Sequence, residues 1–175
     1  LHNEFDFSNY NQIGDIGGAP FSQAWTIKKL NPHLDFLLTD YDKISLKMHL
    51  EHPPFDDPQL IVLDAKRDNF EKLNNCDLLM MWGVDYALED EDLTRLFNYI
   101  KRQGVSLLIA TVKSDEPAIK RLLRLFRSES IRIRGKARMH GVLRNRLYFE
   151  RLCRSSEVVI EAITTIGAYR IYKIN

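Results

Sequence analysis

The stretch Ile13-Gly14-Asp15-Ile16-Gly17-Gly18-Ala19-Pro20-Phe21 decides the fold. A short apolar strand here ends in a carboxylate and two glycines, so the backbone can turn sharply against a ligand, and Pro20 stands where a helix is expected to begin. A second apolar run ends in Asp40, at about the 20-residue spacing at which a carboxylate commonly binds a ribose diol. The pattern indicates a nucleotide-type cleft, and a tight turn without a ligand is the alternative.

Apolar runs alternate with helical patterns along the chain. Strands are predicted at the start of the glycine turn and at residues 36–38, 60–63, 78–82 and 105–110. Continuous apolar runs are typical of parallel strands buried on both faces, and the alternation predicts right-handed crossovers with a ligand site at the carboxyl ends of the strands. Residues 158–163 and 168–174 predict a terminal hairpin joined by residues 164–167.

Helices are predicted between these strands. Phe21, Ala24, Trp25, Ile27 and Leu30 follow helical spacing before Pro32. The acidic run Glu89 to Asp92 is interpreted as a helix start rather than a metal site, because negative charge is favourable at the positive end of a helix dipole. Gly104 is expected to end that helix. Residues 115–127 and 143–153 are predicted to form two further helices, both basic.

Several of these stretches together resemble the class I S-adenosylmethionine-dependent methyltransferases. They are Asp15-Ile-Gly-Gly, Leu37-Leu-Thr-Asp40, Leu60-Ile-Val-Leu-Asp64-Ala65, Cys76-Asp77-Leu-Leu-Met-Met-Trp82 and Val105 to Thr111. The resemblance covers residues 11–112 and, more loosely, the terminal hairpin. It implies an α/β three-layer sandwich, with a seven-stranded, mostly parallel sheet that ends in an antiparallel hairpin and has helices on both faces.

The resemblance also implies the cofactor, S-adenosylmethionine, and the residues that bind it. Gly17 and Gly18 would lie by its carboxylate and amino group, and Asp15 under the turn near that end. Asp40 would bind the ribose, Asp64 and Ala65 the adenine, and Trp82 would face the sulfonium. Where the family usually has its second and third glycines this chain has Ala19 and Phe21. The large ring of Phe21 is therefore expected to intrude on helix packing or on cofactor approach.

Composition places the chain among intracellular globular proteins of one domain. Its 175 residues suffice for a real core, and no apolar run approaches the ~18 to 20 residues that cross a bilayer. Two cysteines give neither a disulfide framework nor metal spacing, and His49 with His52 lacks a third ligand. We therefore expect a soluble, cytoplasmic protein without a bound metal. Because the chain begins with Leu1, we also expect that an N-terminal piece has been trimmed; residues 1–10 are interpreted as a lead-in over the cleft.

The formal net charge of +1 hides a strong asymmetry. Residues 1–112 hold 10 Lys and Arg against 18 Asp and Glu, a net charge of −8, whereas residues 113–154 hold 13 against 4, a net charge of +9. Such a basic block attracts anionic ligands. We therefore interpret residues 1–175 as a single methyltransferase-like domain with a basic insertion or cap at about 113–154.

Methyl transfer to a hydroxyl needs a base near the hydroxyl proton, and His140 in the basic segment is the leading candidate; an exposed loop histidine is the alternative. Asp85 and Tyr86, just after the fourth strand, are the second choice. Arg134 and Arg138, with Arg132, Arg144 and Arg146, are expected to bind an anionic acceptor. No Asn- or Asp-Pro-Pro-aromatic motif follows the fourth strand, which disfavours methylation of an adenine or glutamine nitrogen.

Three functions remain open at this stage. The first is O-methylation of an anionic small molecule or glycan. The second is an RNA methyltransferase that binds phosphates with the same patch of arginines, which has only Tyr148 and Phe149 as aromatic platforms for bases. The third is a non-catalytic binding or scaffold protein whose cofactor pocket Ala19 and Phe21 close.

Overall fold

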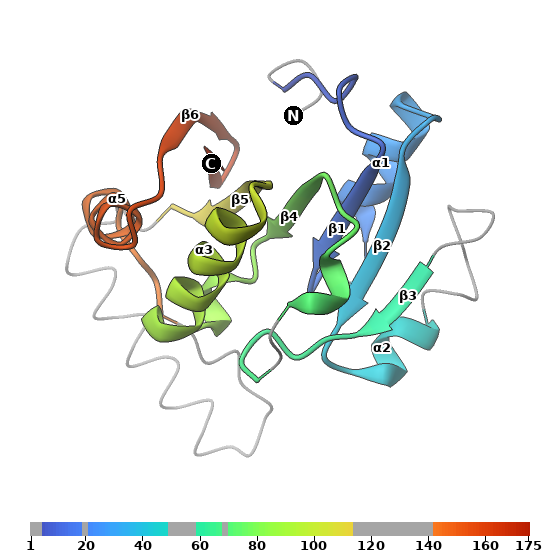
Figure 1. The fold of residues 1–175 in the computed structure, drawn as a ribbon, viewed down its shortest axis with the longest axis horizontal. Coiled ribbons are helices and arrows are strands. Elements are labelled where there is room, and N and C mark those ends of the chain that lie inside the picture. The colour runs from blue at the N-terminus through green and yellow to red at the C-terminus, as the bar shows by residue number, and fades with distance from the viewer. Residues whose placement is uncertain (1–4, 19–20, 49–58, 68–69, 114–141) are drawn as a thin grey trace.

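The computed structural model contains one seven-stranded sheet in the order β3-β2-β1-β4-β5-β7-β6 (Figure 1). It describes residues 5–18, 21–48, 59–67, 70–113 and 142–175. Strands β1 to β5 are mutually parallel, and β7 runs antiparallel to both β5 and β6. This confirms the predicted mostly parallel sheet with a terminal antiparallel hairpin. The strands are β1 Gln12–Ile16, β2 Asp35–Asp40, β3 Gln59–Val62, β4 Leu78–Trp82, β5 Ser106–Val112, β6 Ile160–Ile166 and β7 Tyr169–Ile174.

Helices cover both faces of this sheet, as predicted. They are α1 Ser22–Leu30, α2 Lys43–Met48, α3 Asp90–Gln103 and α5 Arg146–Ser155, with short 3-10 turns η1 Glu71–Leu73 and η2 Asp85–Ala87. On one face Ala24 and Ile27 of α1 join a core cluster with Phe7 and Phe36. On the other face α3 and α5 lie together and share a core cluster that includes Phe97 and Phe149 (Figure 1). None of the helices in the described ranges is long and apolar enough to cross a membrane.

The order of the strands places a switch point between β1 and β4. The chain moves outward from β1 through β2 to β3, and then returns to β4 on the other side of β1 before continuing to β5. Successive connections therefore diverge above the carboxyl ends of β1 and β4. In open α/β sheets this divergence leaves a crevice in which ligands bind.

Helix α1 departs from its prediction at its start. Phe21, expected inside the helix, precedes it with a left-handed backbone (φ 56°), and the helix begins at Ser22. Pro20 lies outside the described residues. Trp25 and Leu30, predicted on the buried face, are 43% and 50% exposed, so the apolar stripe of α1 is narrower than the spacing suggested.

Helix α3 begins where the acidic run predicted it. Glu89 and Asp92 form a reciprocal capping box in which each side chain accepts the other's backbone N–H. Gly104 ends the helix with φ 67°, as expected for a glycine C-cap. In the part of the chain that the structure describes, no three acidic, His or Cys residues gather as a metal site.

Two terminal segments differ from expectation. Strand β6 extends to Ile166, so the predicted four-residue connection shrinks to Gly167 and Ala168. Phe7 of the lead-in packs in the core, and all of residues 5–10 except Ser8 line a cavity with Leu78 and Leu108, near the amino ends of β4 and β5. The described part of the lead-in therefore lies at the edge of the sheet opposite to the switch point and does not cover it.

Candidate functional site

A cavity of about 660 Å³ opens at the carboxyl ends of β1 to β4. This volume lies within the range of small-molecule and cofactor sites. All seven residues predicted to bind the cofactor line it: Asp15, Gly17, Gly18, Asp40, Asp64, Ala65 and Trp82. Residues far apart in the sequence meet here because parallel strands end at the same edge of the sheet.

The turn after β1 depends on Gly17. Its φ of 65° lies in the left-handed region, and a Cβ at this position would be 3.1 Å from Cγ1 of Val84. The Gly17 N–H donates to the carbonyl of Thr39 at 2.9 Å, and the Thr39 hydroxyl donates to the carbonyl of Asp15 at 3.0 Å. These bonds hold the turn against the end of β2.

Asp15 forms the floor of the cavity under Gly18. Its carboxyl is 1% exposed, and burial, followed by the negative charge of Asp40, raises its pKa to about 7. Within the described residues Oδ1 of Asp15 has no hydrogen-bond partner. A Cβ at position 18 would lie 2.0 Å from Oδ2, so only glycine leaves room for this carboxyl. The site therefore holds a buried acceptor atom that a ligand donor can satisfy.

Asp40 is the last residue of β2, and Asp64 lies two residues after the end of β3. Asp40 is buried, and its Oδ1 accepts the Asp42 N–H at 2.9 Å. Oδ1 of Asp64 accepts the Lys66 N–H at 3.0 Å. Arg95 of α3 donates to the carbonyl of Ala65 at 3.1 Å, which fixes the loop that carries Asp64 and Ala65 against α3.

Aromatic residues line the β4 end of the cavity. The rings of Trp82 and Tyr169 have centroids 5.5 Å apart and a tilt of 50°. Gly83 has φ 64°, and a Cβ there would be 3.2 Å from Cε1 of Tyr169, so the ring rests on the glycine. Sequence reasoning missed Tyr169. The available signal was its position at the start of a strand antiparallel to β5, which puts it at the carboxyl edge of the sheet.

Phe21 does not intrude on this cavity. Its side chain is buried in the core cluster of α1 with Ala24 and Ile27, and the residues that line the cavity include Ser22 and Gln23 but not Phe21. The expectation that its ring intrudes on cofactor approach is wrong for this reason. The left-handed backbone at position 21 is what lets the ring turn into the core. Ala19 lies outside the described residues.

The structure separates the residues proposed for catalysis. Tyr86 lines the cavity, and burial, with smaller contributions from Asp85 and Tyr169, raises the pKa of its hydroxyl. Asp85 is buried and is not among the lining residues; burial raises its pKa to about 7 although Arg144 opposes the shift. His140, Arg134 and Arg138 lie outside the described residues, as does Arg132.

Two arginines expected to bind an acceptor have other roles. The side chain of Arg144 is 0% exposed and forms an ion pair with Asp90 at 2.7 Å, so it cannot reach an acceptor in the cavity. Arg146 forms an ion pair with Glu150 at 2.6 Å on α5. The expectation for Arg144 is wrong, because a basic run in the sequence does not reveal which of its members are buried and paired. Arg146 is 54% exposed, so its expected contact with an acceptor stays a prediction.

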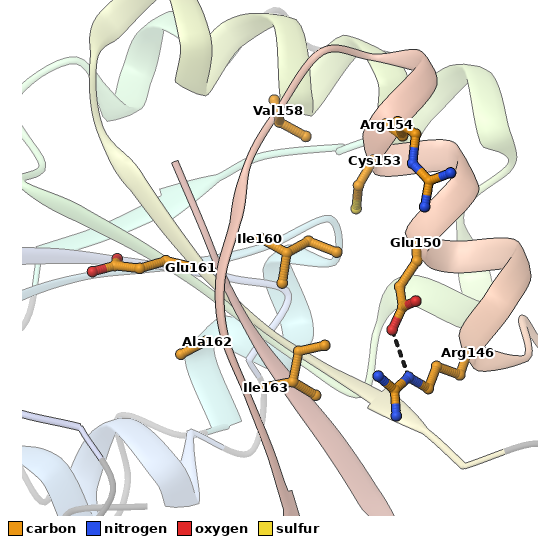
Figure 2. Close-up of a pocket in the computed structure, with 9 residues that line it drawn as sticks. All are labelled: Arg146, Glu150, Cys153, Arg154, Val158, Ile160, Glu161, Ala162 and Ile163. Atoms are coloured by element: carbon orange, nitrogen blue, oxygen red, sulfur yellow. Dashed lines mark hydrogen bonds and ion pairs between the residues drawn. The ribbon is translucent and has the colours of Figure 1, made fainter.

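Arg146 lines a second, more open groove between α5 and β6 (Figure 2). This groove has a volume of about 430 Å³. Figure 2 shows the side chains of Arg146 and Glu150, both from α5, pointing toward each other, so their opposite charges offset one another. Burial raises the pKa of the Cys153 thiol to about 12, which keeps it protonated at neutral pH. We therefore take the cavity at the strand ends, with its buried unpartnered carboxyl, as the functional site.

Comparison with known proteins bears on the fold. No protein-family model matches the chain, and no curated protein is similar to it in sequence. Among solved structures, human N-acetylserotonin methyltransferase in complex with SAM is 17% identical with a TM-score of 0.73, over 99% of this chain and 49% of that one. Mitomycin 7-O-methyltransferase MmcR is 22% identical with a TM-score of 0.71, over 98% and 50%.

A third structure, an O-methyltransferase family protein from Burkholderia thailandensis, is 13% identical with a TM-score of 0.72, over 97% of this chain and 52% of that one. The chain thus spans about half the length of these proteins. Identities this low carry the fold and not the substrate. The protein has the fold of the class I S-adenosylmethionine-dependent methyltransferases.

Proposed function

We propose that this protein binds S-adenosylmethionine in the cavity at the strand ends and transfers its methyl group to a small-molecule acceptor. The observation that carries the proposal is the convergence of seven separately predicted positions, from Asp15 to Trp82, on one cavity. That cavity lies at the switch point of the sheet, where α/β folds bind nucleotide-like ligands.

The residues present fit the cofactor. Oδ1 of Asp15 is a buried acceptor without a partner in the described chain, and an ammonium group can supply the missing donor. Gly18 keeps the space above this carboxyl open. In our proposal Asp40 binds the ribose hydroxyls, Asp64 and Ala65 lie by the adenine, and Trp82 faces the sulfonium.

Bound S-adenosylmethionine supplies a methyl group that is already activated by its positively charged sulfur. The protein then has to align the acceptor and exclude water. Trp82, Tyr86 and Tyr169 do this at the β4 end, where their rings form an apolar wall with two hydroxyl groups. A raised pKa keeps the hydroxyl of Tyr86 protonated at neutral pH, which suits it to orient an acceptor rather than to take its proton.

For the proton itself we propose His140. Histidine as a residue type has an unperturbed pKa of ~6.5, which suits a general base at neutral pH. Asp85 has a pKa of about 7, but it is buried outside the cavity and has no described route to an acceptor. We therefore assign Asp85 a supporting role.

We further propose that the acceptor is an anionic small molecule or glycan methylated on oxygen. The described lining carries the carboxyl groups of Asp15, Asp40 and Asp64 against the single ammonium of Lys66. An anionic acceptor would consequently depend on arginines of the basic segment, with Arg134 and Arg138 as the proposed contacts. RNA is disfavoured, because Phe149, one of the two aromatic residues of the arginine patch, is fully buried against Tyr172, which leaves Tyr148, at 45% exposure, as that patch's platform for a base.

Calorimetry with S-adenosylhomocysteine and S-adenosylmethionine tests the proposal. We expect saturable binding of both, with adenosine binding more weakly because it lacks the group that satisfies Asp15. Absence of binding by protein whose fold is intact by circular dichroism would support the non-catalytic scaffold instead. Transfer of a labelled methyl group to fractionated small anionic metabolites, compared with RNA, then identifies the acceptor class.

A further inference from the structure

Arg144 is the most completely buried cation among the described residues. Its side chain is 0% exposed. The guanidinium donates to the carbonyls of Asp85 at 2.9 Å and Leu88 at 2.8 Å, and from Nε to Oδ1 of Asp90 at 2.9 Å. Its Nη2 lies 2.7 Å from the same oxygen in an ion pair. A fully desolvated charge is retained only with such a set of partners.

These contacts bind the backbone of one short stretch, residues 85–88. The carbonyls of Asp85 and Leu88 flank the single turn of η2, and the carbonyl of Tyr86, between them, accepts the Val142 N–H at 2.6 Å. Residues 142–144 therefore bind the backbone at three points within four residues. On its other side this stretch contributes Tyr86, Ala87 and Leu88 to the lining of the cavity.

The chemistry of the contact requires an arginine. Its planar guanidinium directs several donors to fixed positions, and here they reach two carbonyls and a carboxylate at once. A lysine ammonium can reach part of this set from a single point. A methionine fills the volume and leaves the carbonyls of Asp85 and Leu88 without the guanidinium donor, while Asp90, a third exposed, keeps the hydroxyl of Tyr148, and the loss favours displacement of the stretch.

We propose that Arg144 is a positioning residue that fixes the cavity wall formed by Tyr86, Ala87 and Leu88 and thereby sets the affinity of the cofactor site. The identity of the ligand in this inference rests on the proposed function. The contacts of residues 142–144 with residues 85–90, which we call the clasp, do not depend on it.

The test compares Arg144→Met and Arg144→Lys with two controls. Arg146→Met removes an exposed arginine of the same region whose partner is Glu150. Tyr148→Phe removes a hydrogen bond to Asp90 from the solvent side and leaves the guanidinium in place. S-adenosylhomocysteine affinity is measured by calorimetry at a temperature where each variant is folded by circular dichroism. We expect Arg144→Met to lose at least 10-fold, Arg144→Lys to recover part of the loss, and both controls to stay within 2-fold.

Hydrogen exchange provides a readout that needs no cofactor. In Arg144→Met the amides of residues 85–90 should exchange at least 10-fold faster, while those of residues 96–100 in the same helix layer stay within 3-fold of the wild type. Where Arg144→Met does not fold, Arg144→Lys and Asp90→Asn carry both measurements, with smaller changes in the same direction.

The outcomes separate the two ideas. Local loss of protection with a wild type that binds no S-adenosylhomocysteine supports the clasp and rejects the proposed function. A folded Arg144→Met protein with wild-type affinity, or with unchanged exchange at residues 85–90, overturns the inference, as does an equal loss of affinity in Arg146→Met.

Discussion

The carboxyl group of Asp15 lies directly against the backbone of Gly18. A Cβ added to Gly18 would be 2.0 Å from Oδ2 and 2.3 Å from Cγ of Asp15, well inside van der Waals contact. The backbone of Gly18, unlike that of Gly17, does not have a positive φ. Position 18 is therefore restricted to glycine by its neighbour and not by its conformation.

We expect Gly18→Ala to weaken S-adenosylhomocysteine binding at least 10-fold, because the new methyl group displaces the carboxyl of Asp15. Overpacking by the new methyl group should also lower the free energy of unfolding by about 1 to 3 kcal/mol. Calorimetry and chemical denaturation measure the two effects. Gly104→Ala is the matched control: it strains a left-handed backbone but meets nothing within 4 Å, so it should cost stability without changing affinity.

The stability of the protein should fall as pH rises from about 4 to about 7. Burial raises the pKa of Asp15 from 3.8 to about 7, so between these values the native state holds a proton that the unfolded chain has released. Asp85 contributes in the same direction. Denaturation from pH 5 to 8 should show this slope, and Asp15→Asn should reduce it. Equal slopes in the wild type and Asp15→Asn would show that Asp15 is ionised when buried.

Asp40→Ala should weaken S-adenosylhomocysteine by about 1.5 to 3 kcal/mol, the scale of a hydrogen bond to a charged group. The variant also loses the bond to the Asp42 N–H, so its fold is checked by thermal unfolding. Asp35→Ala, at the opposite end of β2 with an exposed side chain, should leave the affinity unchanged. An unaltered affinity in Asp40→Ala would show that Asp40 does not bind the ribose hydroxyls.

Replacing Arg134 and Arg138 together with Gln should raise the acceptor KM and leave cofactor affinity within 2-fold, since the two ligands occupy different parts of the site. For the wild type, acceptor affinity should fall steeply with salt if the acceptor is a polyanion and shallowly if it carries one or two charges. Steady-state kinetics between about 50 and 300 mM salt measures this slope. A KM independent of both arginines would make them a surface or partner interface.

His140→Ala should lower kcat by about 10² to 10⁴ if it is the general base for a hydroxyl. Cofactor affinity should be unaffected. A pH–rate profile adds a second measurement, because the wild-type rate should rise with pH through the pKa of the base and that limb should vanish in the variant. Unchanged turnover in His140→Ala would show that His140 is not the general base.

The sheet and the composition of the cavity were predictable from sequence for a physical reason. Buried parallel strands are continuous apolar runs, and Leu78–Trp82 was found with its observed bounds. Residues at the carboxyl ends of such strands share one edge of the sheet, which is why Asp15, Asp40 and Asp64, assigned to the cofactor through the family resemblance, line one cavity.

Other features depend on contacts that no local pattern encodes. The ring of Phe21 turns into the core only because its backbone is left-handed, a conformation rare for a bulky residue. Arg144 looks like its basic neighbours in sequence, and its partner Asp90 is 54 residues away. Tyr169 reaches the cavity through the long-range pairing of β7 with β5.

The two cysteines are internal probes of local opening of the core. Both thiols are buried and have pKa values of about 12, so neither should react with an alkylating reagent while the core is closed. Cys76 lies beneath β1, where a Cβ on Gly14 would be 3.0 Å from its sulfur, and Cys153 lies on α5. The alkylation rate of each thiol thus reports how often its own region opens. A ligand that stabilises only the strand ends should lower the alkylation rate of Cys76 more than that of Cys153.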